Sequence, residues 1–231
     1  MKQKERPIIF STKMVRAILD GRKTQTRRPI KPQPDPFAIY AILNEDSLSK
    51  KPHLWISGYG GDGNTWKNPE FDPWFSCPYQ VGDVLWVKET YAISRVGDVE
   101  GAPLCEPIVL YKADGYPDDW KSGYIQRPSI FMPKWASRIK LEITGIRVER
   151  IQDIPERDCI AEGITPISTP NITGDEPTLR EKFADLWDSL WAKKGLGWSQ
   201  NPWVWVIEFR RIENDTNGNE RTLLKTNPTS R

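Results

Sequence analysis

This chain of 231 residues has few histidines and cysteines and a small net charge. It has one histidine, His53, and three widely separated cysteines, Cys77, Cys105 and Cys159, with no CxxC pair among them. These counts argue against a disulfide framework, a structural zinc site and a histidine-based catalytic triad. We therefore expect a protein that uses neither a metal nor another cofactor.

Charge and hydropathy argue against two further classes, proteins that bind nucleic acid through a wholly basic surface and membrane-spanning proteins. The formal net charge is only +2, so any contact with nucleic acid must come from a local basic patch and not from the whole surface. No apolar run approaches the roughly 20 residues of a membrane-spanning helix, and no apolar signal segment follows the N-terminus. The sequence thus predicts a cytoplasmic protein without membrane contact, and it leaves the oligomeric state open.

The most distinctive segment that is present is basic: residues 21–28, with the sequence GRKTQTRR. It holds one amine, two hydroxyls and three guanidinium groups, which together are typical of a site that grips a polyanion or a nucleotide. Helical spacing of apolar residues after Ser11 predicts a helix that ends at Gly21. If the segment is then extended, its side chains alternate between two faces. One face would carry Thr24, Thr26 and Arg28, and the other would carry Gln25 and Arg27.

Apolar periodicity predicts a mixture of strands and helices in the rest of the chain. A shift of the apolar positions at Thr144 and Gly145 predicts a bulge or bend within one strand. A second helix is expected between Pro155 and Gly163, and a third after a capping box at residues 178–181. Alternation predicts strands at residues 7–10, 84–89, 108–112, 139–143 and 203–209. Because the order lacks regular βαβ units, we expect an α+β fold: a largely antiparallel barrel with flanking helices.

We expect a single domain over residues 1–213. Stretches rich in Pro, Gly, Asn, Asp and Trp would form long irregular insertions in it, at about residues 29–80, 94–135 and 165–177. The polar residues 214–231 are predicted to be a disordered tail.

Four segments occur in one order along the chain: the helix ending in GRKTQTRR, then VGDVLWV, VERIQDIPERDCIAEGI and finally WVIEF. This ordered set resembles the ASCH domain family, a group with a PUA-like β-barrel that is tied to RNA and nucleotide chemistry. The resemblance covers the barrel elements, about half of the chain, and leaves the insertions outside. It extends to large ASCH proteins of bacteriophages and prophages.

Within that family, the small bacterial N4-acetylcytidine amidohydrolases resemble this chain at the residues that carry chemistry. Their lysine lies in a G-[RK]-K-T-x-T-x-R segment, which places it at Lys23 here, and their catalytic threonine corresponds to Thr26. Their glutamate lies near the end of the helix after a long strand, which is Glu162. The resemblance implies that Lys23 activates Thr26 or a water while Glu162 positions it and shuttles protons. The chain departs from these enzymes in size, because they lack its Trp-rich insertions.

Read without the resemblance, the same residues have ordinary structural interpretations. A lysine after a helix is usually a solvated charge that suits the helix dipole, and a threonine in a strand is usually chosen for its β-branch. Arginines near such a lysine would lower its pKa, contact phosphate or form surface ion pairs. Tryptophans would stack on bases or fill the core. The further candidates for contact with substrate or nucleic acid are Arg22, Thr24, Arg27, Arg28, Trp86, Trp135 and Arg138.

Three functions remain open at this point. The first is an amidohydrolase of an acylated or otherwise modified nucleoside such as N4-acetylcytidine. The second is a non-catalytic module that binds RNA or a modified base, and the third is a metal-independent ribonuclease. Loss of acetate release in variants of Lys23 or Glu162 would distinguish the first from the second.

Overall fold

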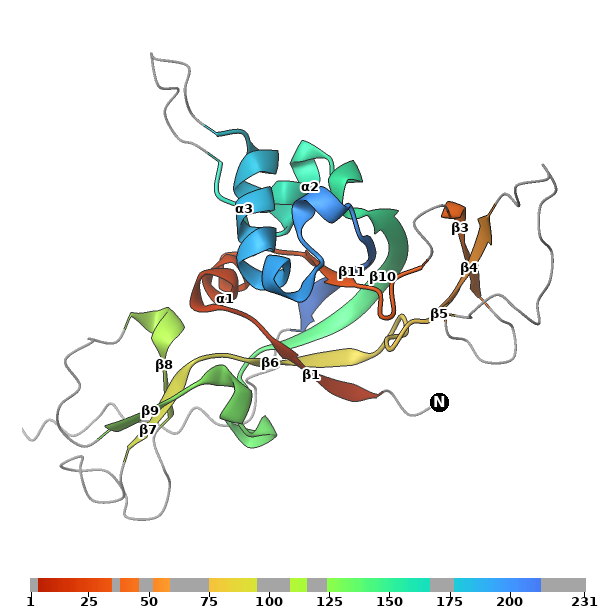
Figure 1. The fold of residues 1–231 in the computed structure, drawn as a ribbon. Coiled ribbons are helices and arrows are strands. Elements are labelled where there is room, and N and C mark those ends of the chain that lie inside the picture. The colour runs from red at the N-terminus through yellow and green to blue at the C-terminus, as the bar shows by residue number, and fades with distance from the viewer. Residues whose placement is uncertain are drawn as a thin grey trace, which may run out of the picture.

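The computed structural model describes residues 4–34, 38–45, 52–58, 75–94, 109–115, 124–166 and 177–212. Its strands and helices confirm the α+β class (Figure 1). The predicted tail and most of the insertion at residues 165–177 lie outside the described residues.

A five-stranded sheet forms the centre of the described fold. Its order is β1-β6-β10-β11-β2, and every neighbouring pair is antiparallel except β1 and β6, which are parallel. The strands are β1 (Glu5–Ile9), β6 (Val84–Lys88), β10 (Lys140–Arg150), β11 (Trp203–Ile212) and β2 (Gln25–Pro29). The register of β10 against β11 shifts between Ile143 and Gly145, which confirms the predicted bulge.

The predicted closed barrel is not found among the described strands, because this sheet is open with β1 and β2 at its edges. The two edges are connected by a side chain and not by paired backbones. The Arg28 side chain on β2 donates a hydrogen bond to the backbone oxygen of Ile9 on β1, at 3.3 Å. A side chain therefore joins the edges at a place where backbone pairing would be needed for closure.

The first two helices end at the predicted glycines, and both glycines are in the left-handed conformation. Helix α1 (Thr12–Leu19) is followed by Gly21 at φ +74°, and α2 (Glu156–Ala161) by Gly163 at φ +96°. A Cβ on Gly163 would lie only 3.0 Å from the Cβ of Ala17 in α1. The two helices can therefore approach each other closely at this point because residue 163 has no side chain.

The third helix, α3 (Leu179–Trp191), begins with the predicted capping box. Thr178 Oγ1 accepts from the Glu181 backbone N–H at 3.2 Å, and Glu181 Oε2 accepts from the Thr178 N–H at 2.6 Å. Phe183 and Trp187 are buried on the face that packs against α2 and the sheet.

The insertions are more regular than predicted. One three-stranded antiparallel sheet, in the order β3-β4-β5, lies within the first insertion. A second, in the order β8-β7-β9, combines β7, which precedes the second insertion, with two strands inside it, of which β8 confirms the strand predicted at residues 108–112. The prediction of irregular chain was wrong here because backbone polar groups in so long a stretch need partners, and short strands between the turn residues supply them. Their strands are β3 (Ala38–Glu45), β4 (Pro52–Gly58), β5 (Phe75–Ser76), β7 (Tyr91–Ser94), β8 (Val109–Tyr111) and β9 (Tyr124–Arg127).

Short 3-10 helices occupy several of the connections. They are η1 (Lys112–Asp114), η2 (Ser129–Phe131), η3 (Lys134–Ala136), η4 (Ile151–Asp153), η5 (Ala192–Lys194) and η6 (Trp198–Gln200). The main core contains α1 and the inner face of the sheet, where Leu85, Leu141 and Ile207 are fully buried. In the part of the chain that the structure describes, no helix has the length and apolarity needed to cross a membrane.

Candidate functional site

Lys23 lies where the C-terminal ends of α1 and α2 meet. Its backbone N–H donates to the Ala17 oxygen of α1 at 2.9 Å, and its Nζ donates to the Glu162 backbone oxygen, just after α2, at 2.7 Å. The Thr24 N–H donates to Ala161 O at 2.9 Å and ties the same segment to α2. Carbonyl groups at a helix end favour a cation, so this location suits an ammonium group.

The Lys23 amine also contacts the carboxylate of Glu162, although the two residues are 139 positions apart. Nζ lies 2.7 Å from Glu162 Oε2 and 2.8 Å from the backbone oxygen of Gln25. Lys23 is only 3% exposed and Glu162 only 5%. All three donors of an ammonium are thus matched by acceptors inside the protein.

Burial lowers the pKa of Lys23 from its ordinary value of 10.5. The Glu162 carboxylate opposes this shift, and the guanidinium groups of Arg28 and Arg27 add to it. Deprotonation of Lys23 to the neutral amine therefore costs less free energy than deprotonation of a lysine in water. A lysine that acts as a base requires this direction of shift.

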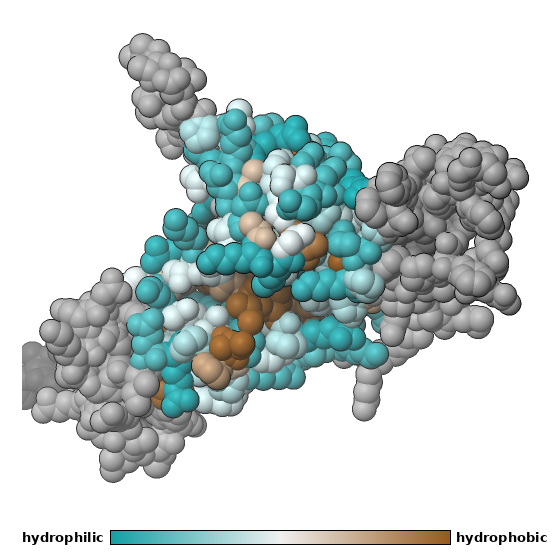
Figure 2. All heavy atoms as spheres, viewed as in Figure 1, coloured by the Kyte–Doolittle hydropathy of each residue, from teal (hydrophilic) through white to brown (hydrophobic). Residues whose placement is uncertain are grey.

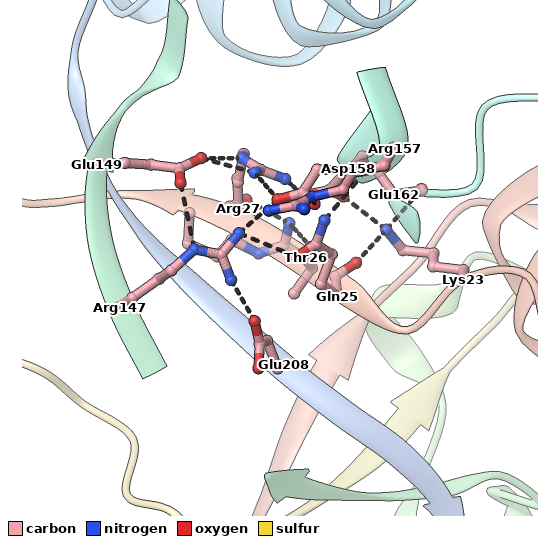
Figure 3. Close-up of polar contacts among 11 residues, drawn as sticks. Lys23, Gln25, Thr26, Arg27, Arg147, Glu149, Arg157, Asp158, Glu162 and Glu208 are labelled. Carbon is pink, nitrogen blue, oxygen red and sulfur yellow. Dashed lines mark hydrogen bonds and ion pairs between the residues drawn. The ribbon is translucent and has the colours of Figure 1, made fainter. Parts of the chain in front are cut away.

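Arg27 lies on the opposite face of β2 from Thr26 and is surrounded by carboxylates (Figure 3). Its guanidinium lies 2.6 Å from Glu149 Oε1, 2.9 Å from Asp158 Oδ2 and 3.2 Å from Glu162 Oε1. The side chain is completely buried. Because Glu162 offers one oxygen to Arg27 and the other to Lys23, Arg27 fixes the orientation of the carboxylate that contacts the lysine.

Arg147 on β10 completes this network. Its guanidinium bonds Asp158 and Glu208, and its Nε lies 3.3 Å from Glu149 Oε2. We call this network, without Glu208, the lysine cluster. Its members are Lys23, Arg27, Arg147, Glu149, Asp158 and Glu162.

Thr26 and Arg28 lie on the other face of β2 and form a pair of their own. Arg28 Nη1 donates to Thr26 Oγ1 at 3.0 Å, and Arg28 has no carboxylate partner among the described residues. Both Arg28 and Lys23 contact the ring of Phe10, with their cationic centres 5.6 and 5.4 Å from its centroid. Phe10 thus brings the Thr26–Arg28 pair and the Lys23–Glu162 pair to one place.

The four side chains offer complementary chemistry at this place. Lys23 and Glu162 can exchange a proton across their 2.7 Å contact. Because Thr26 Oγ1 accepts from Arg28, its own hydrogen is free to be donated to a developing oxyanion, and the unpaired guanidinium adds positive charge nearby.

The other predicted binding residues of the basic segment have separate locations. Arg22 is ion-paired with Asp20 at 2.9 Å, and its Nη1 is buried without a hydrogen-bond partner. Thr24 is exposed. Arg27, as described above, has no exposed donor, so phosphate cannot reach it without opening the lysine cluster.

Arg138, Trp86 and Trp135 lie outside this site. Arg138 pairs with Glu89 at 3.0 Å and Asp114 at 2.7 Å and lies over the Tyr111 ring at 3.9 Å. Trp86 is half-buried on β6, whereas Trp135 on η3 is 62% exposed.

Sequence reasoning missed Phe10, Glu149, Asp158 and Arg147 as site residues. A signal existed for Glu149 and Arg147, because alternation on β10 places both on one face of the strand. Ile143 would share that face only in a strand without the bulge between Ile143 and Gly145. Phe10 gave no such signal, since its position is that of an ordinary core residue after a strand.

Among the described residues, no group of three or more His, Cys, Asp or Glu side chains is arranged to hold a metal ion. No protein-family model, curated protein or solved structure matches the chain.

Proposed function

We propose that this protein is an amidohydrolase that removes an acyl group from a modified nucleoside, with N4-acetylcytidine as the reference substrate. The observation that carries the proposal is the buried contact of 2.7 Å between the Lys23 amine and the Glu162 carboxylate. The resemblance to the ASCH family at Lys23, Thr26 and Glu162 supports the substrate class and the PUA-like assignment of the fold.

The proposed reaction adds water to an amide. Neutral Lys23 takes a proton from a water molecule, whose oxygen attacks the acyl carbon. The Thr26 hydroxyl and the Arg28 guanidinium stabilise the oxyanion that forms. The carbon–nitrogen bond then breaks as the proton passes from the Lys23–Glu162 pair to the leaving nitrogen. The products are the amino form of the base and a carboxylic acid, which releases its proton to solvent and becomes a carboxylate. For this to occur, Lys23 must release one of its three present acceptors when substrate binds.

The test is release of acetate and cytidine from N4-acetylcytidine by the purified full-length chain. We expect Lys23→Met to abolish turnover, and Glu162→Gln to lower kcat by about two orders of magnitude, a typical loss for a proton-transfer group. Lys13→Met, which alters an exposed lysine of α1, serves as the matched control and should retain full activity. Thermal melts identify any variant that fails to fold, and a folded wild-type chain that releases no acyl group from this substrate would refute the proposal.

A second candidate is a module that binds a modified base without cleaving it. It is favoured by one observation: every donor of Lys23 and both carboxylate oxygens of Glu162 already have protein partners. In that case calorimetry would detect binding of N4-acetylcytidine that Arg28→Ala weakens, without any product. Glu162→Gln would then leave the affinity nearly unchanged.

A further inference from the structure

The outer face of β1 and β6 carries exposed apolar and basic side chains. The parallel register places Ile9 beside Lys88 and Pro7 beside Trp86, so all four side chains lie on the side opposite the buried Leu85 and Val87. Ile9 is 45% exposed. Figure 2 shows hydrophobic residues gathered over β1 and β6 on this face of the molecule, with hydrophilic residues around them.

Helices η2 and η3 extend this surface with two aromatic rings. Phe131 is 67% exposed and Trp135 is 62% exposed. Lys88 Nζ donates to the backbone oxygen of Ile130, and Lys134 Nζ lies 2.7 Å from Glu5 of β1, so both helices are attached to the outer face of the sheet. We call this surface the aromatic–lysine face; it comprises Ile9, Trp86, Lys88, Phe131, Lys134 and Trp135.

The aromatic–lysine face, together with its neighbours Glu5 and Lys140, carries predominantly positive charge. Lys140 lies beside Trp86 in the next strand, and it shares its ion-pair partner, Glu5, with Lys134. Lys88 has no ion pair among the described residues, and its amine lies 5.6 Å from the centroid of the Trp86 ring. Three lysines are thus accompanied by one carboxylate.

This surface also adjoins the candidate site. Arg28, the half-buried member of that site, donates to the backbone oxygen of Ile9 at 3.3 Å. The backbone of Ile9 therefore touches the site while its side chain belongs to the aromatic–lysine face. A ligand that lies on this face can extend to Arg28.

We propose that the aromatic–lysine face binds single-stranded nucleic acid, with bases stacked on Phe131 and Trp135 and phosphates near Lys88 and Lys134. Aromatic platforms beside lysines are the general means by which proteins hold unpaired strands. This inference rests on the proposed function and makes the substrate a modified nucleotide within a strand, whose neighbours lie on this face. A second copy of the chain fits less well, because two such faces in contact would bring two positively charged surfaces together.

The experiment measures the binding of a fluorescein-labelled, mixed-sequence, single-stranded RNA of about twelve nucleotides by fluorescence anisotropy, a length within the usual site size for such strands. We expect Phe131→Ala combined with Trp135→Ala to weaken binding at least about tenfold, because stacking is worth about 1–3 kcal/mol per base. Lys88→Gln and Lys134→Gln should each reduce the dependence of log K on log salt by about 0.7. Leu190→Ala and Lys193→Gln are matched controls, since they alter an exposed apolar residue and an exposed lysine at the end of α3.

Equal affinities for the wild-type and the Phe131/Trp135 variant would overturn the inference. So would a shift from dimer to monomer in that variant by sedimentation, without any loss of RNA affinity, because the face would then join two copies. Failure of the proposed function is separable from failure of this inference. Wild-type chain that binds RNA through this face but cleaves no acylated nucleoside supports the inference alone, whereas turnover of the free nucleoside without RNA binding refutes only the inference.

Discussion

The molecule contains two charge clusters, and they are built differently. The lysine cluster joins β2, β10 and α2 with three cations and three carboxylates, and Arg27 at its centre has no exposed surface. The second group, the Arg138 cluster, consists of Arg138, Glu89 and Asp114, and its single cation is 27% exposed. Water can therefore replace part of a lost contact in the Arg138 cluster but not at Arg27. We therefore expect the two clusters to lose different amounts of stability when one partner is removed.

The largest effect is expected from Arg27→Met. It leaves Glu149, Asp158 and Glu162 without their common partner, and breaking a buried charge network in this way costs about 3–5 kcal/mol of the free energy of unfolding. Arg138→Met should cost less, since Glu89 can take up a proton. Urea denaturation at neutral pH checks both, with Arg210→Met as the control for an exposed ion pair. Equal losses for Arg27 and Arg138 would contradict the distinction.

A smaller effect is expected at the glycines beside the two clusters. Gly163→Ala places a Cβ 3.0 Å from Ala17 and 3.4 Å from the Cδ of Lys23, in a backbone conformation that only glycine adopts easily. Gly115→Ala, next to Asp114, has a similar φ of +84° but no atom within 4 Å of its added Cβ. We expect a loss of about 1–3 kcal/mol for Gly163→Ala and about 1 kcal/mol for Gly115→Ala.

If the two alanine variants melt at the same temperature, the close contact between α1 and α2 at Gly163 does not contribute to the free energy of unfolding. A larger loss in Gly163→Ala, accompanied by lower acyl-group release, would show that the spacing of these helices positions Lys23.

The smallest effect is a pH dependence of opposite sign in the two clusters. Burial acts to raise the pKa of Asp158, but hydrogen bonds from Arg27 and Gln25 outweigh it and hold that pKa below the ordinary 3.8. The carboxylate therefore contributes stability above about pH 3.8 that is lost as the pH falls through its folded-state pKa. Burial raises the pKa of Glu89 above 4.5 despite Arg138, so its contribution declines as the pH rises from 4.5 through its folded-state pKa.

Unfolding free energies of Asp158→Asn and Glu89→Gln, measured against wild type from about pH 3 to pH 7, check these signs. The difference between wild type and Asp158→Asn should shrink toward acid, and the wild type should lose stability relative to Glu89→Gln as the pH rises. The same slope in both variants would show that the two carboxylates have similar environments.

The parts of the fold that depend on local rules could be predicted from the sequence. The glycine after α1, the capping box of α3 and the bulge at Thr144 and Gly145 each follow from the conformational needs of a few adjacent residues. The open sheet could not be predicted in this way. The relation of β1 to β2 is a matter of tertiary structure, since they meet through the Arg28 side chain, which is a contact between distant segments.

The candidate site also has one part that local sequence rules predict and another that they do not. Alternation along residues 24–28 predicts two faces for β2, and the structure places Thr26 with Arg28 and Gln25 with Arg27 accordingly. The role of Arg27 was not predictable, because its three carboxylate partners lie more than a hundred residues away. The depth of burial of Lys23 was not predictable either, since it depends on α1 and α2 ending at the same point.

The position of β2 in the sheet has a consequence for the order of folding. β2 carries Thr26, Arg27 and Arg28 yet lies at an edge, and its one neighbour in the five-stranded sheet is β11, the last strand of the described chain (Figure 1). The Thr24 oxygen likewise accepts from the N–H of Phe209 at 2.8 Å. During synthesis, residues 24–28 therefore have no strand to pair with until β11 has been made. A chain truncated before Trp203 would retain every proposed catalytic side chain and still be unable to assemble the site.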